Sequence, residues 1–414
     1  MKFSSLYSKF LQKKKPSDMA SLDRDRPTVA VIGAGLTGLL AAQGLKKNGF
    51  NVVVFEQEAS IDARPQEWTM LIHWAMPLFE KLVPAHILKD LNGALCNPHL
   101  EFTDEIESLP CYNGVTGELL FSSPTPGSRR VSRRRLRKLL TQDIDIRWNQ
   151  SLTGFKKSSE GIKLEFSNGE SFDAHHLLGA DGTWSKVRHL LLGPEQAQPR
   201  TSGFLFATGI TEFNDSEKTN AIIQAHPVAA LMMGTNAVGA VGVMAAGDPS
   251  DKSTWTTFWV KIWQGNAVDL KDGEALDYIK GNTPPLRDIF QSAIDWTPEG
   301  SYVRISEMKY WIPTQWDNYG GRVTLAGDAA HPMLIYRGQG FQHSITDVAS
   351  YVDALTQLHS TEESPEQIIG AYESEMIERG AKAVQQSLSE AEKSLDIEMI
   401  GQMLMAKQGH GKST

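Results

Sequence analysis

Long apolar runs that end in glycine mark both ends of the patterned part of this chain. Near the N-terminus, the run TVAVIGAG (28–35) is followed by the helical pattern LTGLLAAQGLKKNG and by a second apolar run, NVVVFEQ. Strand, turn, helix and strand within about 30 residues is the size of a βαβ unit, whose buried parallel strands are apolar on both faces. A further run, VTLAG, returns at 323–327. These runs predict a parallel sheet.

The middle of the chain has a different pattern. From about 201 to 309 the sequence shows alternating, aromatic-rich segments such as GFLFATGITEF and STWTTFWVKIW, which predict an antiparallel sheet in a second unit. From about 365 the pattern is helical, charged and rich in methionine, and it ends in the disordered-looking KQGHGKST. The predicted fold class is α/β, α+β overall, with a Rossmann-like domain interleaved with an antiparallel β-sheet domain, plus C-terminal helices.

The expected domain boundaries follow these changes of pattern. We expect a flexible arm at 1–26, a discontinuous cofactor-binding domain at 27–76, 129–200 and 310–360, a substrate-binding β-sheet domain at 77–128 and 201–309, and a C-terminal helical region at 361–414.

Composition narrows the class of protein. A chain of 414 residues with 41% hydrophobic content can bury a large core, and a formal net charge of −8 with scattered basic residues does not favour nucleic-acid binding. Cys96 and Cys111 are too few for a disulfide framework and are not spaced for zinc, so we expect thiols in a reducing, cytoplasmic compartment and no metal. No window reaches the roughly 18 apolar residues of a membrane span. The expected protein is soluble, as a monomer or homodimer.

The first glycine turn has the spacing G-x-G-x-x-G. The first glycine permits the tight turn, the second lets a pyrophosphate approach the backbone at the helix N-terminus, and the third lets helix and strand pack closely. An acidic residue ends the next strand, where it can accept hydrogen bonds from a ribose diol and disfavours a 2′-phosphate. The spacing therefore predicts a site for FAD or NAD. The residues expected in it are Gly33, Gly35, Leu36, Thr37, Gly38 and Glu56.

Two more glycine junctions follow strands later in the chain. GADGTWSKVR (179–188) places Asp181 and Gly182 after a strand and before a helix. GDAAHP (327–332) ends another strand with an acidic residue that could hold a polyhydroxyl chain. RGQGFQHSITDVA then starts a helix whose free N–H groups carry partial positive charge. A nicotinamide enzyme would not need these additional junctions, so they favour FAD.

The three motifs in this order resemble the flavin-dependent monooxygenases of the para-hydroxybenzoate hydroxylase fold, the single-component aromatic hydroxylases, over most of residues 28–355. The resemblance implies that the G-x-G-x-x-G glycines and Glu56 hold the ADP half of FAD. It implies that Asp181 and Gly182 contact FAD and NAD(P)H, and that Asp328, after Gly327, binds the ribityl hydroxyls. Arg133, in an R-x-x-L helix whose other arginines we expect mostly on a solvated face, is expected to reach FAD.

The helix that follows the last junction is expected to face the pyrimidine edge of the flavin with Gly338, Gly340 and Phe341. The family usually has Asn two or three residues beyond the last glycine. This chain has FQH there, which leaves the roles of Gln342 and His343 open.

Two residues near the expected flavin are candidates for the chemistry. Pro332 is expected beside the flavin edge where oxygen reacts. Arg337 is either a surface residue or one that lines the flavin cavity. His331 resembles a base, but its position in the family loop favours a structural role.

The resemblance implies that NADPH or NADH reduces the flavin, that O2 adds to it as a C4a-hydroperoxyflavin, and that one oxygen atom passes to an aromatic or other electron-rich substrate. The chain is similar to fungal secondary-metabolite members, so a phenolic, polyketide, indole or prenylated aromatic substrate is expected. A flavin oxidase or dehydrogenase on the same fold and a non-enzymatic FAD-binding regulator remain alternatives. Apolar residues of the alternating sheet are expected to roof the cavity: Phe204, Phe206, Met232, Met233, Trp255, Phe258 and Trp259.

Overall fold

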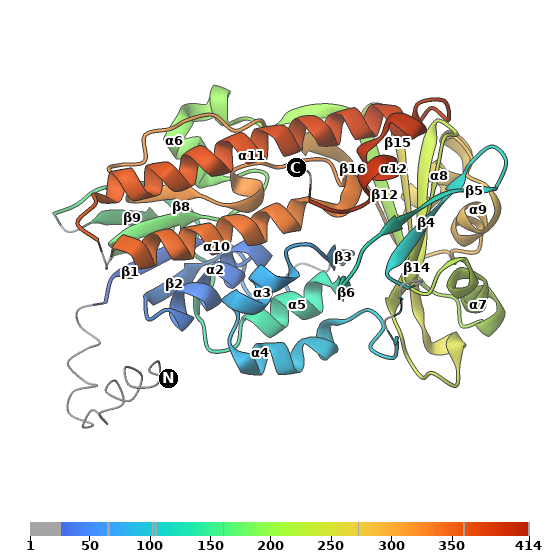
Figure 1. Cartoon of the computed structure of the whole chain (residues 1–414), viewed down its shortest axis with the longest axis horizontal. Coiled ribbons are helices and arrows are strands. Elements are labelled where there is room, and N and C mark those ends of the chain that lie inside the picture. Colours follow the sequence, from blue (N-terminus) through green and yellow to red (C-terminus); the bar gives the residue numbers. More distant parts are fainter. Residues whose placement is uncertain are drawn as a thin grey trace, which may run out of the picture.

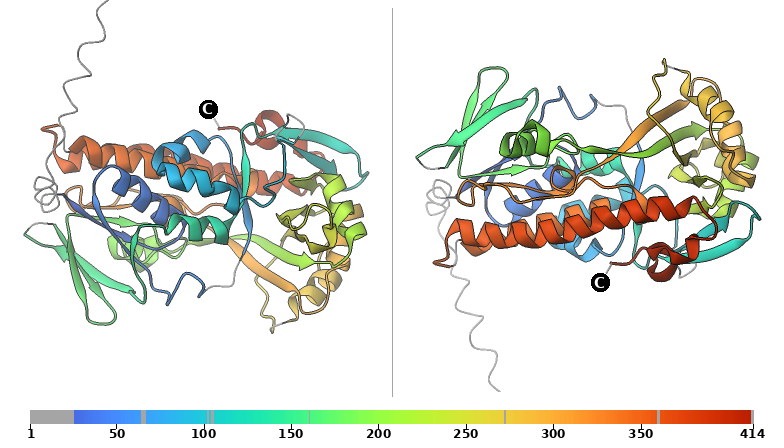
Figure 2. Two further views of the ribbon diagram at one scale, coloured as in Figure 1. Left: turned by 90° about the horizontal axis from the view of Figure 1, so that it is seen from below. Right: turned by 90° about the horizontal axis from the view of Figure 1, so that it is seen from above.

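The computed structural model describes residues 26–63, 67–101, 103, 106–159, 161–271, 273–358 and 361–412 (Figure 1). Apart from Arg26, the expected N-terminal arm lies outside these residues. The described chain forms two units that lie side by side, and one long helix runs along both of them (Figure 2).

The first unit is built on a parallel sheet in the strand order β17-β11-β1-β2-β7, and each neighbouring pair is parallel. Its strands are β1 (Thr28–Ile32), β2 (Asn51–Phe55), β7 (Asp145–Arg147), β11 (His176–Gly179) and β17 (Val323–Leu325). Their buried residues form one core with α2 (Leu36–Lys47), α5 (Arg133–Leu140) and α10 (Gly340–Leu358). The predicted parallel sheet is confirmed, and its last strand comes from a part of the chain almost 300 residues after the first.

Smaller elements complete this unit. They are an antiparallel sheet of β8 (Leu152–Lys157), β9 (Ile162–Phe166) and β10 (Ser171–Ala174), a ribbon of β3 (Thr69–Ile72) and β6 (Arg129–Ser132), and the helices α3 (Met76–Leu82), α4 (Ala85–Asp90) and α6 (Lys186–Ala197). Two details differ from the expectations. The segment 129–142 begins as a strand. Helix α4 and all of α3 except Met76 lie within 77–128, yet both helices pack into the core of the first unit.

The second unit is a seven-stranded sheet in the order β16-β12-β15-β14-β13-β4-β5. Its strands are β4 (Ser108–Asn113), β5 (Leu119–Pro124), β12 (Arg200–Glu212), β13 (Ala229–Met233), β14 (Ala237–Ala245), β15 (Thr256–Gln264) and β16 (Tyr302–Tyr310). Every neighbouring pair is antiparallel except β13 with β4. Three helices cover one face: α7 (Ser216–Ala225), α8 (Ala275–Asn282) and α9 (Asp288–Asp295) (Figure 1).

The two faces of this sheet have different partners, because side chains alternate along a strand. Met232 and Trp259 belong to the core beneath the helices, and Trp259 donates a hydrogen bond to Thr297 at 2.8 Å. Phe204 and Met233 lie on the opposite face, in a core shared with Leu334 of the loop that follows β17. The expected roof residues are therefore divided between the two faces.

Helix α11 (Pro365–Ser394) spans both units, and α12 (Leu404–Gln408) follows it (Figure 2). The C-terminal sequence KQGHGKST, which was expected to be disordered, is ordered as far as Lys412. Helix α12 ends at Gly409, whose φ of +62° lies in the left-handed region that glycine adopts without strain. Among the described residues, no helix is both long and apolar enough to cross a membrane.

A buried carboxyl on α11 makes the stability of this fold depend on pH. Glu373 is 7% exposed and accepts hydrogen bonds from Trp316 at 3.0 Å and Asn318 at 2.9 Å. Burial nevertheless raises the pKa of Glu373 to about 7. A carboxyl whose pKa is raised in the folded chain contributes stability that is fully present below its unfolded pKa. That stability is lost as the pH rises from the unfolded pKa through the folded pKa.

We therefore expect Glu373→Gln to gain free energy of unfolding, relative to the native chain, by about 2–3 kcal/mol between pH 4.5 and pH 8. Urea unfolding at four pH values across this range measures the difference. The matched control is Glu378→Gln on the exposed face of the same helix, which should change the stability by less than about 0.5 kcal/mol. A difference for Glu373→Gln that does not change with pH would contradict the assignment.

Candidate functional site

The G-x-G-x-x-G turn joins β1 to α2, and its three glycines meet different surroundings. A Cβ on Gly33, whose φ is +105°, would lie 2.6 Å from the Ala180 carbonyl oxygen, and one on Gly38 would lie 2.0 Å from the Gly33 oxygen. Both positions therefore exclude any side chain. A Cβ on Gly35 would meet nothing within 4 Å. Gly35 is the N-cap of α2 and has no side-chain capping bond, so it faces open space at the positive end of the helix.

Glu56 follows β2 and lies beside this turn. Its carboxylate accepts the N–H of Ala34 at 2.7 Å and the N–H of Glu58 at 3.1 Å. Arg137 lies 4.0 Å from the same carboxylate and donates to the Ala34 carbonyl at 2.7 Å. Since Arg137 is only 5% exposed, the expected solvated arginine face is wrong at this position. Arg137 fixes the turn and Glu56 together.

The second junction, after β17, packs directly on the first. Gly327 has φ = +64°, and a Cβ there would lie 2.6 Å from Thr37 Oγ1 of α2 and 2.8 Å from Ser344 Oγ of α10. Only glycine therefore allows the β17 loop to lie between the two helices. This contact brings the two glycine junctions, so distant in the sequence, to one edge of the sheet.

Asp328 is the next residue, and part of its side chain is exposed to solvent. The surrounding protein nevertheless raises the pKa of its carboxyl, because partial removal from water outweighs the opposite effect of the positive charges of His331, Arg133 and Arg188. The positive charge of Arg133, at the start of α5, therefore influences the carboxyl of Asp328, in the loop after β17. The Arg133 guanidinium also lies over the ring of Trp68, 4.3 Å from its centroid.

The third junction, after β11, holds its own helix. Asp181 accepts hydrogen bonds from Ser185 Oγ, from the Lys186 N–H at 2.6 Å and from the Val187 N–H at 3.1 Å, so its carboxylate caps α6. Gly182 has φ = +81°. Sequence reasoning did not identify a connection between this loop and the β17 loop.

That connection is Arg188, which is 1% exposed. Its guanidinium donates to the Thr183 carbonyl at 2.6 Å and to the Ala329 carbonyl at 2.8 Å, and thereby ties the two loops together.

The start of α10 carries Gly340 and Phe341, and no acidic residue lies in its first turn.

The structure shows what Gln342, whose role the sequence left open, contacts. Gln342 is fully buried, accepts the His73 N–H at 3.0 Å and donates to the Leu71 carbonyl at 2.6 Å. It therefore fixes α10 to β3. Gly338 is exposed, and its carbonyl lies 3.2 Å from the His73 ring.

A buried polar cluster fixes the β17 loop from behind. Asp347 of α10 is 0% exposed, accepts the Gly327 N–H at 2.7 Å and lies 2.7 Å from His331 Nε2. Arg379 of α11 donates to its other oxygen at 2.8 Å. Burial opposes ionisation, but the charges of His331 and Arg379 hold the pKa of Asp347 below its usual value.

His343 completes the cluster, since its Nδ1 lies 3.0 Å from Arg379. Burial lowers the pKa of His343 to about 3, so this imidazole is neutral. His331 is fully buried in the same cluster, which agrees with the structural role expected for it.

Helix α11 also supports the whole length of this loop. Tyr372 donates to the Leu325 carbonyl at 2.7 Å, Ser387 accepts the Leu334 N–H at 3.2 Å, and Ser394 donates to the Tyr336 hydroxyl at 2.9 Å. Pro332, within the loop, is buried.

Arg337 lies where the loop meets the end of the chain. It is 3% exposed, so the surface alternative is wrong. Its guanidinium donates to the carbonyls of Gly409 at 3.0 Å and Gly411 at 2.8 Å. Gln339 donates to the carbonyl of His410 at 3.1 Å. The C-terminal segment is thus fixed beside the N-terminus of α10.

His410 is buried within this arrangement. Its Nδ1 contacts Ser123 Oγ, and its ring lies 5.9 Å from the ring of His73. Burial lowers the pKa of His410 to about 3 and that of His73 to about 4, so both rings are neutral at physiological pH. Contacts between residues so far apart in the sequence leave no local pattern, and sequence reasoning did not find them.

Comparisons with known proteins agree with this geometry. The model of an FAD binding domain family matches residues 130–387, and that of an NAD(P)-binding Rossmann-like domain matches residues 31–67. The FAD-dependent monooxygenase phnB of Penicillium herquei is 34% identical over 92% of this chain and 94% of its own length. The FAD-dependent monooxygenase cctM of Talaromyces islandicus is 32% identical over 87% of this chain and 90% of its own length.

A solved structure shows the same fold. The 2,6-dihydroxypyridine-3-hydroxylase of Arthrobacter nicotinovorans superposes with a TM-score of 0.69 at 17% identity, over 89% of this chain and 93% of that one.

The different surroundings of the glycines lead to a paired prediction. Gly35→Ala should leave the stability of the cofactor-free protein unchanged but weaken FAD binding at least tenfold, because the new methyl group enters only open space. Gly38→Ala should instead destabilise the cofactor-free protein by roughly 1–3 kcal/mol, since its methyl group meets backbone. Thermal unfolding without FAD and titration with FAD separate the two effects. Equal destabilisation by both substitutions would contradict the distinction.

Removal of the Asp347 charge should loosen the β17 loop. Asp347→Asn removes the buried carboxylate that pairs with His331 and Arg379 and leaves Arg379 only the exposed Glu375 at 2.7 Å, so we expect a loss of about 3–5 kcal/mol of stability and faster release of FAD. The control is Asp353→Asn on the same helix, where an exposed ion pair with Lys81 at 2.8 Å should contribute less than about 1 kcal/mol. Denaturant unfolding and flavin-release kinetics give both quantities. Similar results for the two variants would show that the buried cluster does not hold the loop.

Proposed function

Since the chain belongs to the family of FAD-dependent monooxygenases, we propose that it uses NAD(P)H to insert one oxygen atom from O2 into an aromatic or other electron-rich small molecule. The observation that carries the proposal is the convergence of three glycine junctions at one sheet edge, opposite the apolar face of the large sheet. Such an edge, outside the carboxyl ends of parallel strands, is where open α/β sheets bind ligands.

In this proposal the residues of each junction have separate tasks on FAD. Gly33, Gly35, Leu36, Thr37 and Gly38 bind the pyrophosphate, and Glu56 binds the adenosine ribose. The open space beside Gly35 supports this placement, because a phosphate there would meet the N-terminus of α2.

The other junctions are assigned to the flavin half. We assign Asp328, after Gly327, to the ribityl chain and Arg133 to the same region, which the electrostatic influence of Arg133 on Asp328 supports. Gly338, Gly340 and Phe341 are assigned to the pyrimidine edge of the flavin.

The α10 N-terminus would stabilise negative charge there, because it presents partial positive charge without an acidic residue in its first turn. For Asp181 and Gly182 we propose an indirect role. The Asp181 carboxylate already caps α6, so it positions the loop that faces FAD and NAD(P)H.

When bound, the flavin supplies electron transfer from the nicotinamide and activation of O2. The chain must orient the substrate and keep water away from the reacting atoms. Residues 201–309 and 108–124 supply the apolar sheet face for this task, with Phe204 and Met233 on the side of the β17 loop. Pro332 is assigned to the flavin edge by its position in the β17 loop. Arg337 holds the C-terminal segment beside this loop through its bonds to Gly409 and Gly411.

We further propose that the substrate is a phenolic, polyketide, indole or prenylated aromatic compound. The names of the fungal relatives state only the monooxygenase activity, and that of the Arthrobacter enzyme states a dihydroxypyridine. An aromatic ring that carries oxygen substituents agrees with both the apolar sheet face and the polar groups beside it.

The test is oxidation of NADPH and NADH by the purified flavoprotein in air, with and without a panel of phenolic and indolic compounds. We expect at least one compound to accelerate the oxidation tenfold or more, and to carry one ¹⁸O atom when ¹⁸O2 is supplied. Reduction of the flavin by a compound alone, without response to NAD(P)H, would contradict the proposal and favour an oxidase.

A further inference from the structure

Gly409, His410 and Gly411 lie where the two units meet, and the first unit holds them by their backbone. Arg337 donates to the carbonyls of Gly409 and Gly411, and Gln339 donates to the carbonyl between them. Both side chains are buried, at 3% and 7% exposed. Because buried polar groups are costly to leave unpaired, a segment whose three carbonyls are bound in this way keeps a fixed position against the first unit. We name these three residues the bridge segment.

The second unit holds the same segment by a side chain. His410 Nδ1 shares a hydrogen bond with Ser123 Oγ of β5, and both residues are buried. A Cβ on Gly409, whose φ is +62°, would lie 3.0 Å from Pro124 Cδ and 3.2 Å from Ser123 Oγ. The bridge segment therefore lies directly against β5. His410 is bonded to the first unit through its backbone and to the second unit through its ring.

The chain that leads into the bridge segment is also anchored. Glu390 of α11 is 1% exposed, and its carboxylate accepts the N–H groups of Leu404 at 2.7 Å and Met405 at 3.0 Å, at the start of α12. Met405 is buried in the core that contains Phe204 and Met233 of the large sheet. Since α12 is fixed against the sheet and ends at the bridge segment, His410 has a defined position relative to the sheet.

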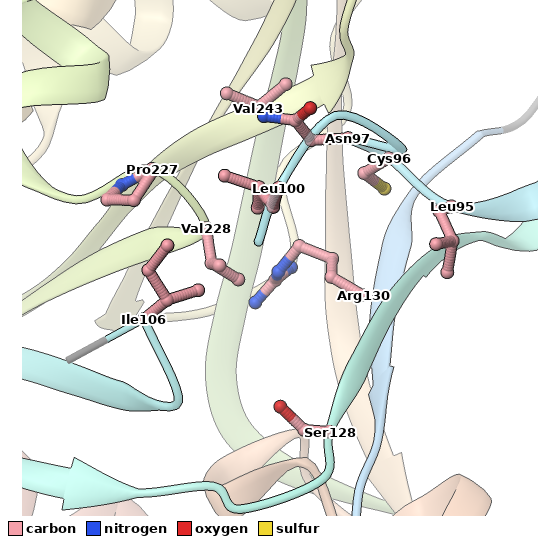
Figure 3. A pocket seen from close by; sticks show the side chains of 10 residues that line it. All are labelled: Leu95, Cys96, Asn97, Leu100, Ile106, Ser128, Arg130, Pro227, Val228 and Val243. Carbon is pink, nitrogen blue, oxygen red and sulfur yellow. The ribbon is translucent and has the colours of Figure 1, made fainter. Parts of the chain in front are cut away.

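The ring of His410 is a neutral hydrogen-bond partner. Figure 3 shows Arg130 of β6 at a small pocket on the boundary of the two units, with its guanidinium directed into the pocket. Burial, and after it the nearby His73, Arg337 and Arg130, lowers the pKa of His410 to about 3. The bond between His410 and Ser123 therefore joins two uncharged groups and does not change over the physiological pH range.

Gln339 connects the bridge segment to the start of α10. The Gln339 amide donates to the carbonyls of Arg337 at 3.0 Å and His410 at 3.1 Å, and its oxygen accepts from Trp74 Nε1 at 3.0 Å. Gln339 directly precedes Gly340, the first residue of α10. The effect of a helix N-terminus on a nearby charge falls off within the first turn. The placement of this residue therefore decides how α10 acts on a bound group.

We infer that His410 is a positioning residue of the flavin site. It joins Ser123, on the sheet that would hold the substrate, to Gln339 at the start of α10, and so fixes the helix N-terminus relative to that sheet. The inference deepens the proposed function and rests on it for the assignment of α10 to the pyrimidine edge of FAD. His410 acts through Gln339 and not by contact with the cofactor. Without its bond to Ser123, the flavin half of FAD should bind less tightly, whereas the ADP half should bind as before.

Titration of the cofactor-free protein with FAD and, separately, with ADP tests the inference, because ADP lacks the flavin half. The change is His410→Leu, which keeps an apolar side chain in the buried position but removes the bond to Ser123. We expect the Kd for FAD to rise about tenfold, the size expected for one lost buried hydrogen bond, and the Kd for ADP to change less than about twofold. A general structural defect would weaken the binding of both ligands.

Two further variants separate the hydrogen bond from packing. His410→Asn retains a polar group that can bond to Ser123, so it should keep the Kd for FAD within about threefold of the native value. Ser123→Ala removes the same bond from the other side and should match His410→Leu, and the double variant should bind FAD no more weakly than either.

The matched control is Lys407→Ala on the exposed surface of α12, which should change neither Kd. Thermal unfolding confirms that each variant is folded, and Ser123→Ala provides the comparison if His410→Leu does not fold.

Two results would overturn the inference. One is a native Kd for FAD in both His410→Leu and Ser123→Ala, and the other is an equal loss of FAD and ADP affinity in these variants. Failure of the proposed function has a different signature. If FAD affinity alone depends on His410 and Ser123 but no compound stimulates NAD(P)H oxidation or gains ¹⁸O, then the oxygen-insertion proposal is wrong and the positioning role remains.

Discussion

The closeness of backbone segments at the carboxyl edge of the parallel sheet is the constraint on which the site depends. The loops after β1, β11 and β17 approach one another so closely that side chains are excluded at Gly33, Gly38 and Gly327. Each glycine lets one segment lie against the next, and Arg188 then joins the two later loops through their carbonyls. Because these contacts leave no room for a side chain, the N-terminal part of α2 and the β17 loop that carries Asp328 lie side by side at this edge. A long dinucleotide requires such an arrangement, in which several distant segments keep fixed relative positions.

The two sides of the β17 loop are packed differently, with polar side chains on one side and apolar side chains on the other. Behind the β17 loop, His331, Asp347 and Arg379 form a largely buried polar cluster. Such networks contribute specificity of structure more than net stability, since desolvation of the charges offsets their attraction. On the other side, the large sheet presents apolar side chains that need only exclude water. The region thus combines a hydrogen-bonded polar support behind the β17 loop with an apolar sheet face in front of it.

The sequence alone predicted the fold class and the three glycine junctions, because these depend on local spacing. The βαβ pattern, the alternation from 201 to 309 and the helix after Gly340 are all read from neighbours in the chain. The supports of the site could not be predicted in this way. Gln342 bonds to residues some 270 positions away, and Arg188 reaches across 141 residues to Ala329. Arg137 looked like a surface arginine because its neighbours are arginines, and only the tertiary structure shows it turned inward. The division of the sheet residues between two faces likewise depends on which helices cover the sheet.

The contact of Arg337 and Gln339 with Gly409 to Gly411 has a consequence for how the protein is made. The parallel sheet takes its last strand from residues 323–325, and the segment that lies beside α10 comes later still in the chain, at residues 409–411. Domains fold as they emerge from the ribosome, N-terminal parts first. Most of the first core can therefore form before residues 409–411 have been synthesised. The N-terminus of α10 gains its contacts with Gly409, His410 and Gly411 only after the sheet that positions it is in place.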